Sequence, residues 1–362
     1  MVASKFVSSI WNFSNQKSDP IHNLFRWYGK LPPPLVAKVL DMYCSPGDTI
    51  LANFSGSGTI AYEAMIRGIF CIGTDINPLA LLISKVKTTK LKNTQKECIE
   101  NTISNALSKY KNIELEQYNL YEPSKWFYPG AAEKLLALRE EIERIKDADV
   151  KDILLIALLS IVRECSKIDA RCVNHIVVDN KKISKDVFEE FRKEANYCWD
   201  ETTKISINTS KPRFYQNSAE NLSFLENDSI NFVFSHPPYL NAVNYYNIYR
   251  LCTDLMNFKY SDIREKDFSA KQYKNFISVM KNSFTESFRV LKHGGKMAVV
   301  IGDVRYQGNI ITLGVDFINA LKQIGFKIED IFIWELNQKA GMNVARRGNF
   351  IDHNYVIIAK KE

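Results

Sequence analysis

Residues 49–75 read TILANFSGSGTIAYEAMIRGIFCIGTD, and their pattern decides the fold class. Thr49–Phe54 is a short apolar run typical of a buried strand, and Ser55–Gly58 is a turn. Helical spacing follows from Thr59 to Arg67, and a second apolar run extends from Ile69 to Asp75. Strands that alternate with helices in this way indicate an α/β protein with a parallel sheet.

The turn in this stretch predicts a loop that binds a nucleoside. Gly56 and Gly58 let the backbone turn tightly and approach a ligand, and the helix that follows presents free amide groups. Asp75 ends the next strand, where a carboxylate can accept hydrogen bonds from both ribose hydroxyls. Ala61 replaces the third glycine of a dinucleotide motif, and the Gly-Lys-Ser/Thr of a phosphate loop is absent. A plain tight turn is the alternative.

The C-terminal part of the chain, residues 213–362, returns to the same alternation. Its expected strands are 230–234, 296–301, 328–336 and 355–359, its expected helices are 280–291 and 313–324, and a turn is expected at 293–295. We expect one antiparallel strand at the edge of the sheet. The first of these strands runs directly into Ser235-His236-Pro237-Pro238-Tyr239. Because ligands gather at the carboxyl ends of parallel strands, this segment is the expected reactive loop, with a proline turn as the alternative.

A mainly helical block separates the two α/β parts. Helical spacing occurs at 131–145, 153–165 and 187–199. Because such a block is too large for a single crossover connection, we expect an inserted subdomain. The expected division is 1–90 for the N-terminal segment and the cofactor-binding half of the core, 91–212 for the insertion, and 213–362 for the catalytic half.

The composition indicates a globular protein with a small basic excess. The chain has 362 residues, of which 46% are hydrophobic, and a net charge of +7, which fits a polyanionic partner without requiring one. Seven cysteines without a C-x-x-C pair indicate reduced thiols. Cys165 and Cys172 lie near His175 in the sequence, but buried thiols beside a loop histidine are the favoured interpretation, so we expect no metal site. The longest apolar stretch, Ile153–Val162, is too short to span a bilayer, and no signal peptide is evident, so we expect a soluble cytoplasmic protein.

Three segments resemble motifs of the DNA amino-methyltransferases, in the family's order. Phe54–Thr59 is similar to the family's F-x-G-x-G-T motif, and Trp27–Pro33 resembles the motif that precedes it. Ser235–Tyr239 resembles the (Asp/Asn/Ser)-Pro-Pro-(Tyr/Phe) motif of enzymes that methylate adenine N6 or cytosine N4. The resemblance covers about 27–90 and 213–360. It implies a Rossmann-like class I methyltransferase core with a mostly parallel seven-stranded sheet, S-adenosylmethionine as cofactor, and double-stranded DNA as substrate.

The resemblance also assigns site residues. The expected cofactor-binding residues are Tyr28, Lys30, Phe54, Gly56, Gly58, Thr59, Asp75, Ile76, Asn217 and Ser218, and the expected catalytic residues are Ser235, His236, Pro237, Pro238 and Tyr239. The motifs depart from the family pattern in three places. Ala52 and Asn53 replace an Asp-Pro pair whose carboxylate receives the amino group of the cofactor. Asn217 replaces the acid that contacts the adenine, and His236 replaces Asp, Asn or Ser.

The residue types of the catalytic motif suit methylation of an exocyclic amino group. That nitrogen is a poor nucleophile because its lone pair is delocalised into the ring of the base. A side-chain acceptor and the carbonyl of the first proline can bind its two hydrogens and aim the lone pair at the methyl group. A neutral His236 offers one acceptor nitrogen, or it takes a proton after the transfer. Tyr239 is expected to stack on a base flipped out of the duplex.

Contacts to DNA are expected in two parts of the chain. Tyr245, Tyr246, Tyr249 and Arg250 follow the catalytic motif, and core packing is the alternative for each of them. The helical block is expected to take part in target recognition, and a solvated helical face is the alternative there. The candidate phosphate contacts are Lys167, Arg171, Lys181, Lys182 and Lys185, together with Arg346 and Arg347.

The expected setting is restriction-modification or another defence system, with a restriction or defence protein as partner. Two other function classes stay open. One is an RNA amino-methyltransferase, and the other is a catalytically impaired methyltransferase-like protein that binds nucleic acid.

Overall fold

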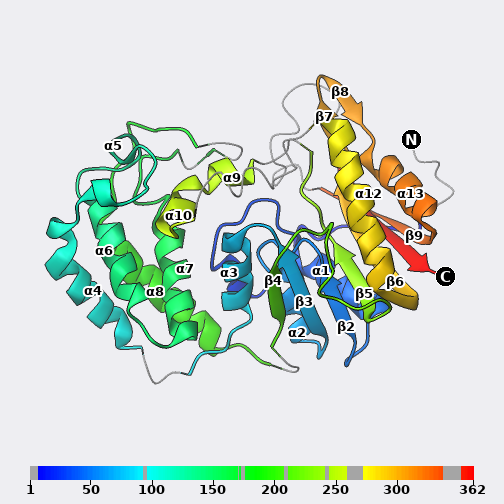
Figure 1. The fold of residues 1–362 in the computed structure, drawn as a ribbon, viewed down its shortest axis with the longest axis horizontal. Helices are drawn as coiled ribbons and strands as arrows, with labels where there is room; N and C mark the ends of the chain where they lie inside the picture. Colours follow the sequence, from blue (N-terminus) through cyan, green and yellow to red (C-terminus); the bar gives the residue numbers. More distant parts are fainter. Residues whose placement is uncertain are drawn as a thin grey trace.

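The computed structural model describes residues 7–92, 96–169, 171–172, 176–207, 211–240, 244–258, 272–336 and 352–362. Figure 1 shows a twisted sheet with helices on both faces and a block of helices beside one end of the sheet. The fold class expected from the sequence, an α/β Rossmann-like class I methyltransferase core, is confirmed.

Eight strands form the main sheet within the described residues. Their order across the sheet is β1 (Ser9–Trp11), β9 (Phe326–Glu335), β10 (His353–Lys361), β6 (Leu291–Gly302), β5 (Ile230–Ser235), β2 (Thr49–Ala52), β3 (Phe70–Asp75) and β4 (Arg213–Gln216). The six strands predicted by range are present, β4 supplies the seventh that the resemblance implies, and the short β1 adds an eighth by pairing in parallel with β9.

The antiparallel strand is β10, and it lies inside the sheet instead of at the edge where we expected it. It pairs with β6 on one side and with β9 on the other. The physical reason lies in its sequence, because Asn354–Ala359 is buried without interruption on both faces. An edge position would leave half of that surface in water.

Two separate cores form on the two faces of the sheet, because successive side chains of a strand point in opposite directions. Leu51, Val233 and Val299 belong to one core, and Ile50 and Phe232 belong to the other. The helices that cover the first face are α12 (Tyr273–Val290) and α13 (Leu313–Ile324), and those that cover the second are α1 (Pro33–Tyr43) and α2 (Thr59–Met65).

The turn expected at 293–295 is instead a bulge inside β6. The register jumps from Ile230 opposite Leu291 to Phe232 opposite Lys296. Gly294 has a φ of 77°, a value that favours glycine, so the extra residues are accommodated without ending the strand.

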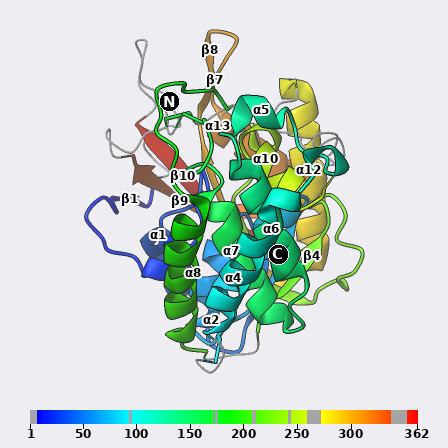
Figure 2. The same cartoon turned by 90° about the vertical axis from the view of Figure 1, so that its left-hand side faces the viewer.

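The helical block shares one hydrophobic core with parts of the chain on both sides of it. Its helices are α4 (Cys98–Lys109), η3 (Tyr110–Asn112), η4 (Leu115–Gln117), α5 (Pro123–Trp126), α6 (Ala131–Glu143), α7 (Ala148–Ile161) and α8 (Val187–Thr203). The same core includes α3 (Pro78–Lys87), the segment after η1 (Pro20–Asn23), and α10 (Arg250–Leu255) from beyond the catalytic motif. Figure 2, which looks onto the block, shows α7 and α8 lying in front of the sheet. The block is therefore held by segments from both halves of the core.

No helix of the described residues is both long enough and apolar enough to cross a membrane. All seven cysteines are free thiols, and burial raises the pKa of Cys165 to about 12. No group of three or more His, Cys, Asp or Glu residues within the described ranges is placed to hold a metal ion, and His175 lies outside those ranges.

One buried ammonium group fastens the last strand to the rest of the core. Lys361 Nζ donates to Asp228 Oδ1 at 2.7 Å, to the Phe288 carbonyl at 2.8 Å and to the Leu291 carbonyl at 2.7 Å. Its side chain is 7% exposed. Three acceptors satisfy this charge, so the removal of the ammonium would leave them without their donor.

Replacement of Lys361 by methionine is expected to lower the free energy of unfolding by about 2 kcal/mol, because it leaves two carbonyls without their donor while the half-exposed Asp228 carboxylate returns to water. Lys360→Met is the matched control. Lys360 is half-buried, and its Nζ forms a weak ion pair with Glu329 Oε1 at 3.8 Å. The loss of this ammonium should lower the free energy of unfolding by less than about 1 kcal/mol. Chemical denaturation of both variants measures the difference, and equal losses would contradict the role given to Lys361.

Candidate active site

The parallel register brings four strand ends to one edge of the sheet. Ala52 at the end of β2 is opposite Gly73 of β3 and Phe234 of β5, and Asp75 at the end of β3 is opposite Gln216 of β4. The loops that follow β2, β3, β4 and β5 therefore share this edge, which we call the carboxyl edge. They carry the glycine turn, Asp75, Asn217 and the catalytic motif, in the place where α/β sheets bind ligands.

The glycine loop is fixed to β3 and to α3. The Gly56 amide donates to Asp75 Oδ2 at 2.9 Å, and the Gly56 carbonyl accepts from Ser84 Oγ at 3.1 Å. Gly58 has a φ of 73° and is the residue before α2 begins. A Cβ on Gly58 would lie 2.6 Å from Ser84 Cα, so only glycine fits between α2 and α3 at this point.

Asp75 is held as an acceptor at the end of β3. Its Oδ1 accepts from the Asn77 amide and its Oδ2 from the Gly56 amide, each at 2.9 Å. These two amides fix the direction of the carboxylate, and each carboxylate oxygen can accept more than one hydrogen bond.

Two hydroxyl groups of the same loop also fit a polar ligand. Ser57 Oγ and Thr59 Oγ1 are buried and have no hydrogen-bond partner among the described residues. Buried polar groups are normally paired, so such groups beside a glycine turn point to a bound molecule or ordered water. The glycine backbone, the Asp75 carboxylate and these hydroxyls together fit a nucleoside cofactor.

Tyr28 and Lys30 have their polar ends bonded to other parts of the chain, and their role as cofactor contacts stays a prediction. Lys30 Nζ donates to the His22 carbonyl at 2.7 Å, and burial lowers its pKa. The Tyr28 hydroxyl donates to the Cys172 carbonyl at 3.2 Å. The neighbouring Trp27 approaches the loop, because its Nε1 lies 3.4 Å from the place of a Cβ on Gly56.

Trp27 was not among the predicted cofactor-binding residues, because sequence alone does not show the direction of a side chain. Its ring stacks on Tyr249 at 4.7 Å between centroids with an interplanar angle of 7°, and on Tyr245 at 5.5 Å. The Tyr249 hydroxyl donates to the Arg26 carbonyl and accepts from the Tyr28 amide. At 2% exposure, Tyr249 is a core residue, and the interpretation as a DNA contact is wrong for it.

Asn53 follows the Ala52 that replaces the carboxylate of the motif, and its Oδ1 is a buried acceptor with no hydrogen-bond partner among the described residues. It is 1% exposed, and its Nδ2 donates to Ser287 Oγ on α12 at 3.1 Å. Asn217 is half-buried, and its Oδ1 accepts from the Ser218 amide at 2.9 Å. Phe54 packs against the core beneath α12. The Ile76 carbonyl accepts from the Gln216 side chain at 3.4 Å.

The catalytic motif begins with the last residue of β5. Ser235 is fully buried, and its hydroxyl has no partner among the described residues. His236 is half-buried, and its ring meets that of Tyr239 edge to face at 5.6 Å. Burial lowers the pKa of His236 to about 4, so its imidazole is neutral at pH 7 and keeps one acceptor nitrogen.

Tyr239 rests on the end of the neighbouring strand. Its Cε2 lies 3.2 Å from the place of a Cβ on Gly302, the last residue of β6. Burial raises the pKa of its hydroxyl. The absence of a side chain at Gly302 therefore leaves room for the tyrosine ring at the carboxyl edge.

Most of the basic residues expected to contact phosphates are already engaged. Arg171 pairs with Asp169 at 2.8 Å and Lys185 with Glu164 at 2.9 Å. Lys182 donates to the Ile168 carbonyl at 3.1 Å, and Lys167 to the Ser124 carbonyl at 3.1 Å. Lys181 is exposed, while Arg346 and Arg347 lie outside the described residues.

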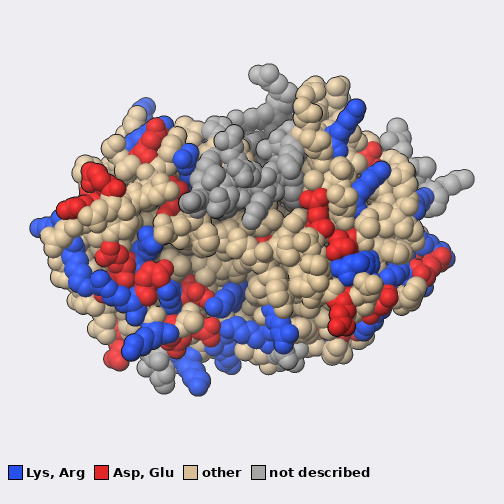
Figure 3. All heavy atoms as spheres, viewed as in Figure 1, with Lys and Arg blue, Asp and Glu red and all other residues tan. Residues whose placement is uncertain are grey.

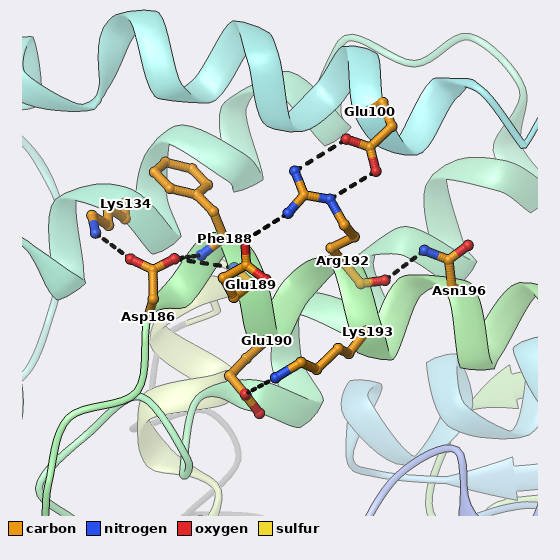
Figure 4. A network of polar contacts seen from close by, with 9 residues as sticks. All are labelled: Glu100, Lys134, Asp186, Phe188, Glu189, Glu190, Arg192, Lys193 and Asn196. Carbon is orange, nitrogen blue, oxygen red and sulfur yellow. Dashed lines mark hydrogen bonds and ion pairs between the residues drawn. The ribbon is translucent and has the colours of Figure 1, made fainter.

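Ion pairs cover other parts of the helical block as well. Figure 4 shows Arg192 of α8 between Glu100 of α4 and Glu189, with Lys134 of α6 bound to Asp186. Acidic and basic side chains alternate on this side of the molecule in Figure 3. For these charges, the pattern fits the alternative interpretation, a solvated helical face.

Gly58→Ala is expected to destabilise the protein by about 3 kcal/mol or more, because it combines an unfavourable φ with a clash against the backbone of α3. Gly47→Ala is the control, since Gly47 has a φ of 92° but nothing within 4 Å of its Cβ position. That variant should lose only about 1 kcal/mol. Denaturant unfolding gives both values, and a similar loss in the two variants would refute the close approach of α2 to α3.

Comparison with known proteins identifies relatives of the chain. A family model described as DNA methylase, of the N6/N4 methyltransferases, matches residues 2–86 and 230–362. The type II methyltransferase M.BsoBI of Geobacillus stearothermophilus is 24% identical, over 95% of this chain and 86% of its own length. M.MjaII of Methanocaldococcus jannaschii is 22% identical, over 80% and 73%. Among solved structures, TrmN from Thermus thermophilus aligns over 95% of this chain and 52% of its own, at 12% identity and a TM-score of 0.40.

The family match lies on both sides of the helical block and covers more than half of the chain. It includes the glycine loop, Asp75 and the catalytic motif. The chain therefore belongs to the N6/N4 methyltransferase family of DNA methylases, with S-adenosylmethionine as its cofactor.

Proposed function

We propose that this protein transfers a methyl group from S-adenosylmethionine to an exocyclic amino nitrogen of a flipped base in double-stranded DNA, either cytosine N4 or adenine N6. The observation that carries the proposal is the shared carboxyl edge, where the glycine loop and Asp75 lie beside Ser235–Tyr239. Restriction-modification is the proposed setting, because the two curated relatives are named type II methyltransferases.

In the proposed reaction, the protein acts by binding and orienting its substrates. Asp75 would accept from the ribose hydroxyls, and the buried Ser57 and Thr59 hydroxyls would offer further hydrogen bonds to the cofactor. S-adenosylmethionine supplies an electrophilic methyl group. His236 accepts one hydrogen of the target amino group, and the Pro237 carbonyl accepts the other. Pro238 stiffens the loop, and the Tyr239 ring stacks on the extruded base.

A part in target recognition for residues 91–212 stays a prediction. In the structure, Arg171 and Lys185 are held in ion pairs and Lys182 donates to a backbone carbonyl. The number of basic residues in this block therefore supports target recognition less than it did from the sequence alone. If these residues bind phosphates, each must first release a partner, which reduces the gain in free energy.

The proposed activity is tested by incubation of the protein with DNA of mixed sequence and labelled S-adenosylmethionine. Nucleoside mass spectrometry should then find N4-methylcytosine or N6-methyladenine. Asp75→Ala should weaken cofactor binding in calorimetry by about tenfold or more, because a charge-assisted acceptor is lost. His236→Ala should retain cofactor binding and lose turnover. Labelled RNA with unlabelled DNA, or cofactor binding without any methylated nucleoside, would overturn the proposal.

The pH dependence tests the proposed role of His236. The pKa of His236 is lowered to about 4, so its neutral form is present above that value and is lost only as the pH falls toward it. The ratio of the turnover of the wild type to that of His236→Asn should thus stay constant from pH 8 to pH 6. Titrations elsewhere in the chain cancel in this ratio. A fall in this ratio by half near pH 6.5 would show that His236 titrates with the pKa of an ordinary, solvated histidine, and it would contradict the prediction.

A further inference from the structure

A short β-ribbon rises from the carboxyl edge directly after β6. It consists of β7 (Val304–Tyr306) and β8 (Asn309–Ile311), which pair with each other in antiparallel fashion. Within the described residues it forms a two-stranded sheet separate from the main one. Both Figure 1 and Figure 2 show it standing above the rest of the molecule.

The ribbon is anchored on one face and exposed on the other. Val304 belongs to the core beneath α12 and α13, and its pairing partner Ile311 packs against that core with Tyr306. Arg305 is paired with Ile310, and both are exposed, with Ile310 at 41%. An isolated two-stranded ribbon is marginal in water, so this anchoring keeps the exposed face in a defined position.

The tip of the ribbon is also fixed by its backbone. Gln307 has a φ of 49° and Gly308 a φ of 85°, the two positive values of a tight hairpin turn. The Arg305 guanidinium donates to the Gly308 carbonyl at 3.5 Å. Gln307, Gly308 and Asn309 are exposed at the tip. A preorganised tip loses little conformational entropy when it binds a partner.

We propose that the β7–β8 ribbon enters a groove of the target duplex beside the flipped base and contacts its base edges. The inference rests on the proposed function, because it places DNA at the carboxyl edge. A two-stranded ribbon fits the major groove of B-form DNA, and Arg, Gln and Asn side chains match the donor and acceptor pattern of base edges there. The exposed Ile310 would make an apolar contact in the groove.

The charge and position of the ribbon favour DNA over another protein as its partner. Residues 304–312 contain Arg305 and no acidic residue. The ribbon follows Gly302, which is packed against Tyr239 of the catalytic motif. A duplex whose base reaches Tyr239 must therefore pass close to the start of the ribbon.

The test compares ribbon variants with a matched surface variant in the full-length protein. Arg305→Ala removes the exposed cation, and Gln307→Asn shortens the amide while asparagine still suits the positive φ. Lys322→Ala is the control, because Lys322 is exposed on α13 at the end away from the ribbon. Affinity for duplex DNA over a range of salt concentrations, the set of sequences methylated, and calorimetry with S-adenosylmethionine are the measurements.

We expect Arg305→Ala to weaken DNA binding about tenfold while cofactor binding stays unchanged. Either the slope of log affinity against log salt falls by about one, as for a phosphate contact, or the preferred sequence changes, as for a base contact. Gln307→Asn should alter the sequences that are methylated. Lys322→Ala should match the wild type in every measurement.

Wild-type methylation of DNA with ribbon variants that behave like Lys322→Ala would overturn the ribbon proposal and leave the proposed function standing. A wild type that binds S-adenosylmethionine but no DNA would overturn both. Ribbon variants that change only self-association, measured by sedimentation, would assign the ribbon to a contact between copies of the chain and so also overturn the proposal.

Discussion

The contact between Gly58 and Ser84 is the constraint on which the site depends. It sets the separation between the start of α2 and α3, and a single added methyl group would force them apart. The same serine donates to the Gly56 carbonyl, and Asp75 accepts from the Gly56 amide. The loop and the carboxylate are thus positioned by the packing of two helices, so the geometry of the proposed cofactor site follows from the core.

Aromatic packing connects this loop to the proposed base-binding side. Trp27 lies against Gly56 and stacks on Tyr249, whose hydroxyl holds the backbone of the Trp27 segment on both sides. Tyr249 directly precedes α10, and α10 packs in the core of the helical block. The glycine loop and the helical block are therefore joined by a continuous chain of packed rings.

Sequence reasoning succeeded where the determinants are local and failed where they depend on direction or on distant partners. The strand–turn–helix of 49–65 follows from apolar runs and glycine turns, while its ligand chemistry stays a prediction of the family motifs. The prediction named Tyr28 and did not include Trp27, which lies against Gly56, because a motif fixes positions but not which side chain faces inward. The strands of the ribbon and β1 are three residues each, too short for a period to appear. Their stability comes from the cores they pack against, which the local sequence does not contain.

The departure at His236 has a physical logic within the proposed mechanism. A carboxylate in this buried place would bring a charge whose desolvation is costly, whereas a neutral imidazole provides an acceptor without one. Burial lowers the pKa of His236 to about 4, so the neutral imidazole is the form present at pH 7. Of the two roles that sequence left open, the lowered pKa favours the hydrogen-bond acceptor that orients the lone pair. Within the proposed mechanism, the proton that the amino group loses would then pass to solvent.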